Sequence, residues 1–297
     1  MKKSIQGIFL ALSAAIGWGM ISPIAKILSS MGINLMTVMI FRSIFTIFVV
    51  GQYIIFVKKE KPFYCLKKDI FIFYVISGIL SVAFAGGGFL MSLAYLTVPE
   101  ALVIHYTFPL FTILGSYFIT RESPTCLQVV AGVLIIVGVY IGMGGTQNNG
   151  LSITGIIWGI VSVIGMSGQS LVVRRFSLNH QLDEYNLLFY SNFTGVIVLI
   201  LFKTMYFGWC DLKIISYFSL FLMTFQALIS SVLAYGAFFI ALKYISAVMV
   251  SLFCAFEIVV GILLTAIILK IIPTYPEIIG SLIIICAISC ISITSKK

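Results

Sequence analysis

The sequence predicts an all-α membrane protein with about ten transmembrane helices in two inverted five-helix repeats. Its composition, the lengths of its apolar segments and an internal repeat each support this fold class. The chain has 297 residues, of which 61% are hydrophobic and only 9% are charged. Because a soluble domain has roughly 25% charged residues, this composition excludes a secreted disulfide scaffold, a nucleic-acid-binding protein and a disordered chain.

The apolar segments are long enough to cross a bilayer. A helix needs about 20 apolar residues to cross roughly 30 Å of hydrocarbon. Charged residues and breaks rich in Gly, Pro or Asn divide the chain into ten such segments. They run over residues 5–27, 33–57, 70–96, 99–119, 126–145, 153–173, 185–206, 214–242, 246–269 and 275–294. The connections are too short to hold a soluble domain.

The distribution of Lys and Arg predicts the orientation. Cytoplasmic loops retain positive charge, and the chain has 18 Lys and Arg against 9 acids. With the N-terminus inside, thirteen of these cations lie on the cytoplasmic side, four lie outside and Arg42 lies within a span. We therefore expect a multi-pass protein of the plasma membrane with both termini in the cytoplasm. The first apolar segment, at about 23 residues, is too long for a signal peptide and is interpreted as a retained helix.

The residues that build cofactor sites and disulfides are sparse. The six cysteines and two histidines lack the spacing of a metal site, and Cys210 is alone on the outer side. The sequence also has no phosphate-binding loop of the Gly-x-x-x-x-Gly-Lys-Ser/Thr type. We expect no cofactor, no metal, no nucleic-acid partner and no direct use of ATP.

The chain matches itself at an offset of about half its length. The matched pairs include Gly17 with Gly165 and Gly132 with Gly280 at an offset of 148, and Gly87 with Gly236 at 149. Their order along one nearly constant offset predicts two repeats, over residues 1–146 and 151–297. Since each repeat holds an odd number of spans, the second is inverted relative to the first. Inverted repeats are typical of secondary transporters, whose two halves exchange conformations around a central site.

Several short motifs occur in order along both halves of the chain. They are Gly17-Trp18-Gly19-Met20 followed by Pro23 and Lys26, Arg42 in span two, Leu93-Ala94-Tyr95, Pro109, Arg121-Glu122, Gly132 and Ala241-Leu242-Lys243-Tyr244. Together they resemble the EamA-type repeat of the drug/metabolite transporter superfamily. The sequence departs from the family pattern in span nine, at Ile258 and at Leu269-Lys270. The resemblance implies transport of small polar metabolites such as amino acids, amines or nucleosides, without choosing among them.

Glu257 is the first candidate site residue. It lies about eleven residues into span nine, on the order of 16 Å deep and close to the bilayer midplane. A charge in the bilayer interior costs at least about 2.5–3.5 kcal/mol, so such residues usually face a cavity or a partner. Glu257 is therefore expected to bind a substrate ammonium group or to carry a coupling proton. The alternative is a structural ion pair with Arg42.

His105 and Tyr106 are the second candidates. They lie in span four, which the repeat makes equivalent to span nine, so His105 is expected to face Glu257 across the pseudo-symmetry axis. Such a pair could relay a proton or hold a zwitterion. The alternative is that His105 packs as an ordinary buried histidine.

The remaining candidates are aromatic, polar or helix-shaping residues. Those expected to line a cavity or to form interhelical hydrogen bonds are Trp18, Tyr95, Gln169, Gln226 and Tyr235. Those assigned structural roles are Arg42, Gly87, Pro109 and Gly236. The cavity itself is expected between spans one, three, four, six, eight and nine, as the resemblance implies.

Secondary transport of a small polar metabolite by alternating access is therefore the leading hypothesis for the function. Its partners would be the small-molecule substrate, the lipid bilayer and a coupling proton or counter-substrate. A membrane-embedded enzyme acting on a lipid-linked substrate is the alternative. Such an enzyme normally clusters acids, His or Arg at one interface, whereas the cytoplasmic loops here hold mostly Lys. A passive channel is disfavoured because no ring of charges is evident.

Overall fold

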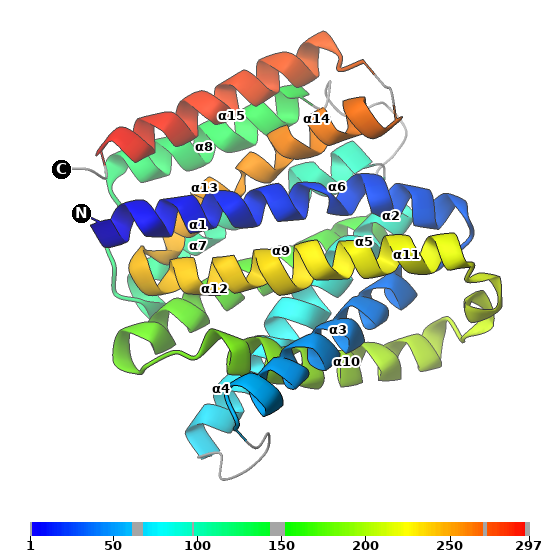
Figure 1. The fold of residues 1–297 in the computed structure, drawn as a ribbon. Helices are drawn as coiled ribbons and strands as arrows, with labels where there is room; N and C mark the ends of the chain where they lie inside the picture. The colour runs from blue at the N-terminus through cyan, green and yellow to red at the C-terminus, as the bar shows by residue number, and fades with distance from the viewer. Residues whose placement is uncertain (1, 61–67, 97, 143–151, 270–271, 295–297) are drawn as a thin grey trace.

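The computed structural model describes residues 2–60, 68–96, 98–142, 152–269 and 272–294, and within these ranges the regular structure is entirely helical (Figure 1). The fold class predicted from the sequence is thereby confirmed. The residues between the two predicted repeats, 147–150, lie outside the described residues.

The first half contains five helical runs, several of them interrupted. They are α1 (Lys2–Gly19) with α2 (Ile21–Ser30); α3 (Leu35–Gln52) with η1 (Tyr53–Val57); α4 (Lys68–Gly78), η2 (Ile79–Gly87) and α5 (Gly88–Tyr95); α6 (Val98–His105) with α7 (Phe108–Ile119); and α8 (Cys126–Gly142).

The second half repeats this plan. Its elements are α9 (Ile153–Asn179); α10 (Glu184–Tyr206) and the short η3 (Cys210–Ile214); α11 (Tyr217–Gln226), η4 (Ala227–Leu233) and α12 (Ala234–Tyr244); α13 (Ala247–Cys254) with α14 (Phe256–Leu269); and α15 (Tyr275–Thr294). The predicted segments agree with these runs to within a few residues.

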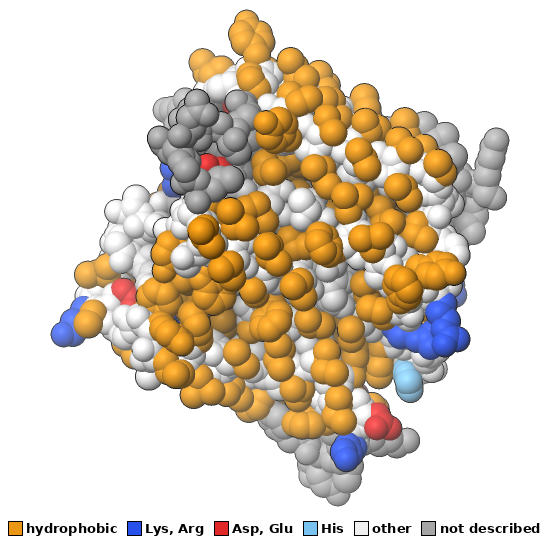
Figure 2. All heavy atoms as spheres, turned by 180° about the vertical axis from the view of Figure 1, so that it is seen from behind, with side chains coloured by type: hydrophobic (Ala, Val, Ile, Leu, Met, Phe, Trp, Pro, Cys, Tyr) orange, Lys and Arg blue, Asp and Glu red, His pale blue; other side chains and the backbone are white. Residues whose placement is uncertain are grey.

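The outer surface is that of a multi-pass membrane protein. Among the described residues, eight helical runs are long and apolar enough to cross a membrane, and α8 and α15 add shorter apolar helices. Large apolar side chains such as Phe118 and Met205 are 78% and 75% exposed. Hydrophobic side chains cover most of the face seen in Figure 2, with charged groups near its edges. In water such a surface would aggregate, whereas lipid solvates it.

The two halves interlock through their first and third runs. Helix α1 packs against α12 of the other half, and α9 packs against η2 and α5 in the same way. Two repeat-equivalent glycines allow this close approach. A Cβ on Gly17 would lie 2.7 Å from Ala234 Cβ, and one on Gly165 would lie 2.3 Å from the Ala85 backbone nitrogen. Helix α3 packs against α10, and α8 against α15.

Two kinds of helix interruption recur at equivalent places in the two halves. Spans four and nine each break near their centre, after His105 and at Ala255. Spans three and eight each contain a π-helical segment, η2 and η4. Both kinds of irregularity are frequent at functional sites, because they free backbone groups and redirect side chains.

Ion pairs tie α3 to α10 at both ends. At the end that holds the starts of α1 and α8 and the end of α15 (Figure 1), Lys58 after η1 pairs with Asp183, which caps α10. At the other end Lys203 Nζ lies 3.0 Å from Asp211 Oδ1, and Thr37 donates a hydrogen bond to the same carboxylate. Burial alone would raise the pKa of Asp211, but the hydrogen bonds from Thr37 and Lys203 outweigh it and hold that pKa below its usual value.

Further polar contacts join other helices at the end that holds the chain ends. Arg174 of α9 donates to Glu122, after α7, at 2.6 Å and to the Leu242 carbonyl of α12 at 3.0 Å. Lys243 of α12 pairs with Glu184 of α10. These contacts close this end of the bundle.

Candidate functional site

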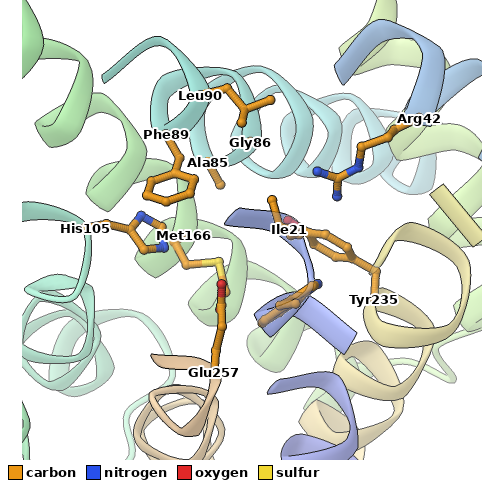
Figure 3. A pocket seen from close by; sticks show the side chains of 11 residues that line it. Ile21, Arg42, Ala85, Gly86, Phe89, Leu90, His105, Met166, Tyr235 and Glu257 are labelled. Carbon is orange, nitrogen blue, oxygen red and sulfur yellow. The ribbon is translucent and has the colours of Figure 1, made fainter. Parts of the chain in front are cut away.

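A cavity of about 40 Å³ lies where the interrupted helices meet, with room for about three water molecules (Figure 3). Its lining is formed by three charged or polar side chains, three aromatic ones and smaller apolar groups. These are Arg42, His105 and Glu257; Trp18, Phe89 and Tyr235; and Ile21, Ala85, Gly86, Leu90 and Met166. They come from spans one, two, three, four, six, eight and nine. The predicted set of spans is thus present, with span two in addition.

Arg42 and Glu257 lie on different walls of the cavity. Figure 3 shows Arg42 and Tyr235 across from His105 and Glu257. The two charges interact electrostatically, yet among the described residues they do not form an ion pair within 4 Å. The two charges are therefore not neutralised by a direct ion pair.

Arg42 is 3% exposed and is held by one hydrogen bond, from its Nε to Ser231 Oγ at 3.0 Å. A guanidinium carries five N–H donors. The structure gives its two Nη groups no partner among the residues it describes, and they are not sealed within protein. Arg42 is thus oriented by η4 and keeps donors for an anionic group in the cavity.

Glu257 lies in the first turn of α14, directly after the break at Ala255. A carboxylate here is stabilised by the partial positive charge of the helix N-terminus. Its side chain is half-buried and lines the cavity, and it interacts electrostatically with Tyr106 on span four. Tyr106 is 1% exposed, and its hydroxyl has no hydrogen bond of ordinary geometry. Tyr106 is not among the residues that line the cavity.

His105 is 9% exposed at the last position of α6, before the break in span four. Its Nδ1 lies 2.8 Å from Ser162 Oγ on α9, and Ser162 in turn donates to the Ala85 carbonyl of η2 at 2.9 Å. The Phe89 ring packs 4.7 Å from the imidazole, centroid to centroid. The histidine is thus fixed by spans three and six while one edge reaches the cavity.

Trp18 and Tyr235 form an aromatic wall. Their ring centroids are 4.9 Å apart in an edge-to-face arrangement, and Phe238 packs 5.1 Å from Trp18. The Trp18 indole N–H donates to the Ser230 carbonyl of η4 at 3.1 Å. Aromatic faces of this kind bind cations and flat apolar groups.

Some predicted site residues lie elsewhere. Tyr95 ends α5 and is 46% exposed, because the last turn of that helix leaves the packed interior. Gln169 is fully buried in α9, outside the cavity, and neither end of its amide has a partner. Gln226 donates to the Ile21 carbonyl and forms an interhelical hydrogen bond. Arg42, for which the sequence favoured a structural role, lines the cavity and also bonds Ser231.

The other three residues that were assigned structural roles differ in how closely their surroundings pack. Pro109 is buried at the start of α7, directly after the helix break. Proline is tolerated there because the backbone N–H that it lacks would have no partner within the helix. A Cβ on Gly87 would lie 2.9 Å from Leu199 Cδ2, so Gly87 permits close packing. Gly236 is different, because a Cβ there would meet Leu188 Cδ1 at an ordinary 3.7 Å. The packing of Gly236 does not require glycine.

Sequence reasoning missed the serines of the site. Ser162 and Ser231 contact cavity residues through their hydroxyls, and Ser230 does so through its backbone carbonyl. Ser81 lines a smaller cavity of about 10 Å³ that shares Tyr235 with the main one. Single serines in apolar helices carry no periodic signal, so only the packing of the helices reveals them. No group of three His, Cys, Asp or Glu side chains that could hold a metal occurs among the described residues.

Comparisons with known proteins agree with this architecture. The model of the EamA-like transporter family matches residues 5–143 and, a second time, residues 153–293. A crystal structure described only as that of a protein superposes with a TM-score of 0.79 at 14% identity, covering 98% of this chain and 97% of that one. At this identity the similarity demonstrates the fold alone. The comparison with curated proteins found no match. The chain belongs to the EamA-like transporter family.

Proposed function

We propose that the protein is a secondary transporter that moves a small polar metabolite, an amino acid, an amine or a related compound, across the plasma membrane by alternating access. The observation that carries this proposal is the cavity at the helix breaks, with Arg42 and Glu257 on different walls. Intramembrane charges usually mark a substrate or ion pathway, because they are costly elsewhere in the bilayer.

The two charges favour a zwitterionic substrate within this class. An ammonium group would bind Glu257 and an anionic group would bind the free Nη donors of Arg42, through charge-assisted hydrogen bonds. The apolar part of the substrate would contact Trp18 and Phe89. A simple amine would leave Arg42 uncompensated in a closed cavity, and a simple anion would leave Glu257 uncompensated.

Alternating access is supported by the inverted repeat. The breaks in spans four and nine are repeat-equivalent, and so are the π-helical segments of spans three and eight. Two halves built this way can exchange their conformations and expose the cavity to one side and then the other. In this proposal α8 and α15 also cross the bilayer, which gives ten spans with both termini in the cytoplasm. A proton on Glu257 or a counter-substrate would drive the exchange.

The test is flux through liposomes that contain the purified protein. A panel of amino acids and amines is first screened for thermal stabilisation, because a ligand that binds only the folded state raises its melting temperature. Stabilising compounds are then loaded inside, and uptake of the labelled compound is measured from outside. The proposal predicts saturable uptake that the internal substrate stimulates. Non-saturable flux would indicate a channel, and turnover of a lipid-linked compound without flux would indicate an enzyme.

A further inference from the structure

The hydrogen bonds around His105 indicate which of its ring nitrogens carries a proton. Ser162 Oγ and the Ala85 carbonyl oxygen are 2.9 Å apart, within the range of an O–H···O hydrogen bond. A carbonyl has no hydrogen, so the Ser162 hydroxyl donates its one hydrogen to Ala85. Ser162 can then only accept from His105 Nδ1, 2.8 Å away. This hydrogen-bond pattern requires a proton on Nδ1.

The other nitrogen is left without a partner in the protein. Among the described residues no hydrogen-bond partner reaches His105 Nε2, and this atom is not sealed within the protein. Figure 3 shows the imidazole at the cavity, on the same side as Met166 and Glu257. The rings of Phe89 and Phe108 pack against the imidazole, at 4.7 and 5.5 Å between centroids, and cannot accept or donate in its place.

We propose that Ser162 is a positioning residue that holds the proton of His105 on Nδ1. We also propose that the imidazole, 9% exposed and packed against the rings of Phe89 and Phe108, is neutral, so that Nε2 is a hydrogen-bond acceptor for the substrate. The recognised class is thereby narrowed to zwitterions with an N–H or O–H group at this wall. This inference rests on the proposed function for the substrate, but the proton position can be tested without any transport. The charged groups that line the cavity with His105 are Glu257, on the same side, and Arg42, across from it.

Nitrogen-15 NMR of the purified protein labelled in histidine measures the proton position. The chain contains two histidines, and His180→Gln removes the signals of the second one, which is exposed near the end of α9. At neutral pH the inference predicts a protonated Nδ1 and an unprotonated Nε2 for His105. A proton on Nε2, alone or together with one on Nδ1, would overturn the inference.

Ser162→Ala tests the positioning role. Without the Ser162 hydroxyl, Nδ1 loses its acceptor, so the proton is expected to redistribute toward Nε2. Ser170→Ala is the matched control, because Ser170 is equally buried in α9 but donates only to its own helix, at Met166. Its histidine spectrum is expected to stay unchanged. An unchanged spectrum in Ser162→Ala would remove Ser162 from the mechanism.

The recognition role is tested with the zwitterion that gives the strongest stabilisation in the screen. Ser162→Ala is expected to weaken its binding about threefold to tenfold, the usual effect of one neutral hydrogen bond, while Ser170→Ala leaves it unchanged. A redistributed proton with unchanged affinity would show that Nε2 does not recognise the substrate. Absence of any binding zwitterion, together with the predicted spectrum, would contradict the proposed function and leave the proton assignment in place.

Discussion

Trp18 in α1 donates its indole N–H to the carbonyl oxygen of Ser230 in η4, at 3.1 Å. In the other half, Ser162 of α9 donates to the carbonyl of Ala85 in η2 at 2.9 Å. Each π-helical segment is therefore bonded to the first helix of the opposite repeat. These bonds cross the boundary between the repeats beside the cavity.

Trp18→Phe is expected to destabilise the protein, because the Ser230 carbonyl loses its side-chain donor while the ring packing against Tyr235 is largely kept. Hydrogen bonds between membrane helices contribute about 0.5–2 kcal/mol, so the melting temperature should fall measurably. Trp158→Phe is the matched control, since Trp158 packs on Phe202 and its indole N–H has no partner among the described residues. Equal losses in the two variants would argue against this role of the Trp18 bond.

The pair of α8 and α15 depends on close backbone contact at Gly280. A Cβ there would lie 2.3 Å from the Gly138 carbonyl oxygen, a contact that only backbone movement can relieve. We expect Gly280→Ala to lower thermal stability by about 1–3 kcal/mol, the usual range for overpacking. Gly236→Ala has room for its methyl group and is expected to keep wild-type stability in the same thermal unfolding assay. A stable Gly280→Ala variant would contradict the packing described.

Asp211 is expected to make stability depend on acid pH. The pKa of Asp211 in the folded protein is lower than its usual value. The ionised carboxylate therefore stabilises the fold at pH values above the usual pKa, and this stabilisation is lost as the pH falls through the lowered pKa. Thermal unfolding of the wild type should therefore shift to lower temperature below about pH 4. Asp211→Asn should be destabilised already at neutral pH, by up to about 3–5 kcal/mol, because Lys203 is 0% exposed and loses its counter-charge.

Asp69 supplies the control for this measurement. It is exposed in the first turn of α4, and Asp69→Asn should change stability by no more than about 1 kcal/mol. If Asp211→Asn kept both the neutral-pH stability and the acid-dependent loss of the wild type, the ion pair with Lys203 would have no part in either.

Two native cysteines test the orientation of the chain. Cys126 and Cys210 are exposed at opposite ends of the bundle, at the start of α8 and in η3. In variants that keep a single cysteine, a membrane-impermeant maleimide applied to intact cells should label Cys210 and leave Cys126 unlabelled until the cells are opened. The reverse pattern would place both termini outside.

Physical constraints of the bilayer explain what the sequence predicted well. The length of the apolar segments determined the helices, and the cost of a buried charge singled out Glu257, which the structure places at the cavity. The constant offset of the repeat related span four to span nine, and both His105 and Glu257 line the cavity.

The remaining features depend on how the helices pack, which local sequence does not encode. Arg42 was assigned a structural role because span two was not expected to line the cavity, yet its guanidinium extends there from α3. Gln169 and Tyr95 are polar, as are several residues that line the cavity. Gln169 is nevertheless fully buried between packed helices, and Tyr95 is 46% exposed on the outside. Neither a π-helical segment nor a single serine produces a recognisable sequence motif. The bonds of Ser162 in α9 and of the Ser230 carbonyl in η4 were therefore not predicted.

Three roles of Glu257 give different results in Glu257→Gln. If the carboxylate carries a coupling proton, substrate exchange persists while uphill, pH-driven accumulation is lost. If it only compensates Arg42, neutralising both residues restores a folded and active protein. If it binds a substrate ammonium group, affinity itself falls. Glu277→Gln is the matched control. Glu277 also lies in the first turn of a helix, but it accepts a hydrogen bond from the Thr274 backbone N–H and lies outside the cavity.

The affinity of Glu257→Gln for the stabilising zwitterion, measured by ligand-dependent thermal stabilisation, tests the central claim most directly. The account predicts an affinity more than tenfold weaker than in the wild type and in Glu277→Gln, because a hydrogen bond to a charged group contributes about 1.5–3 kcal/mol. Unchanged affinity and unchanged pH dependence in Glu257→Gln would contradict the account and remove this carboxylate from substrate recognition.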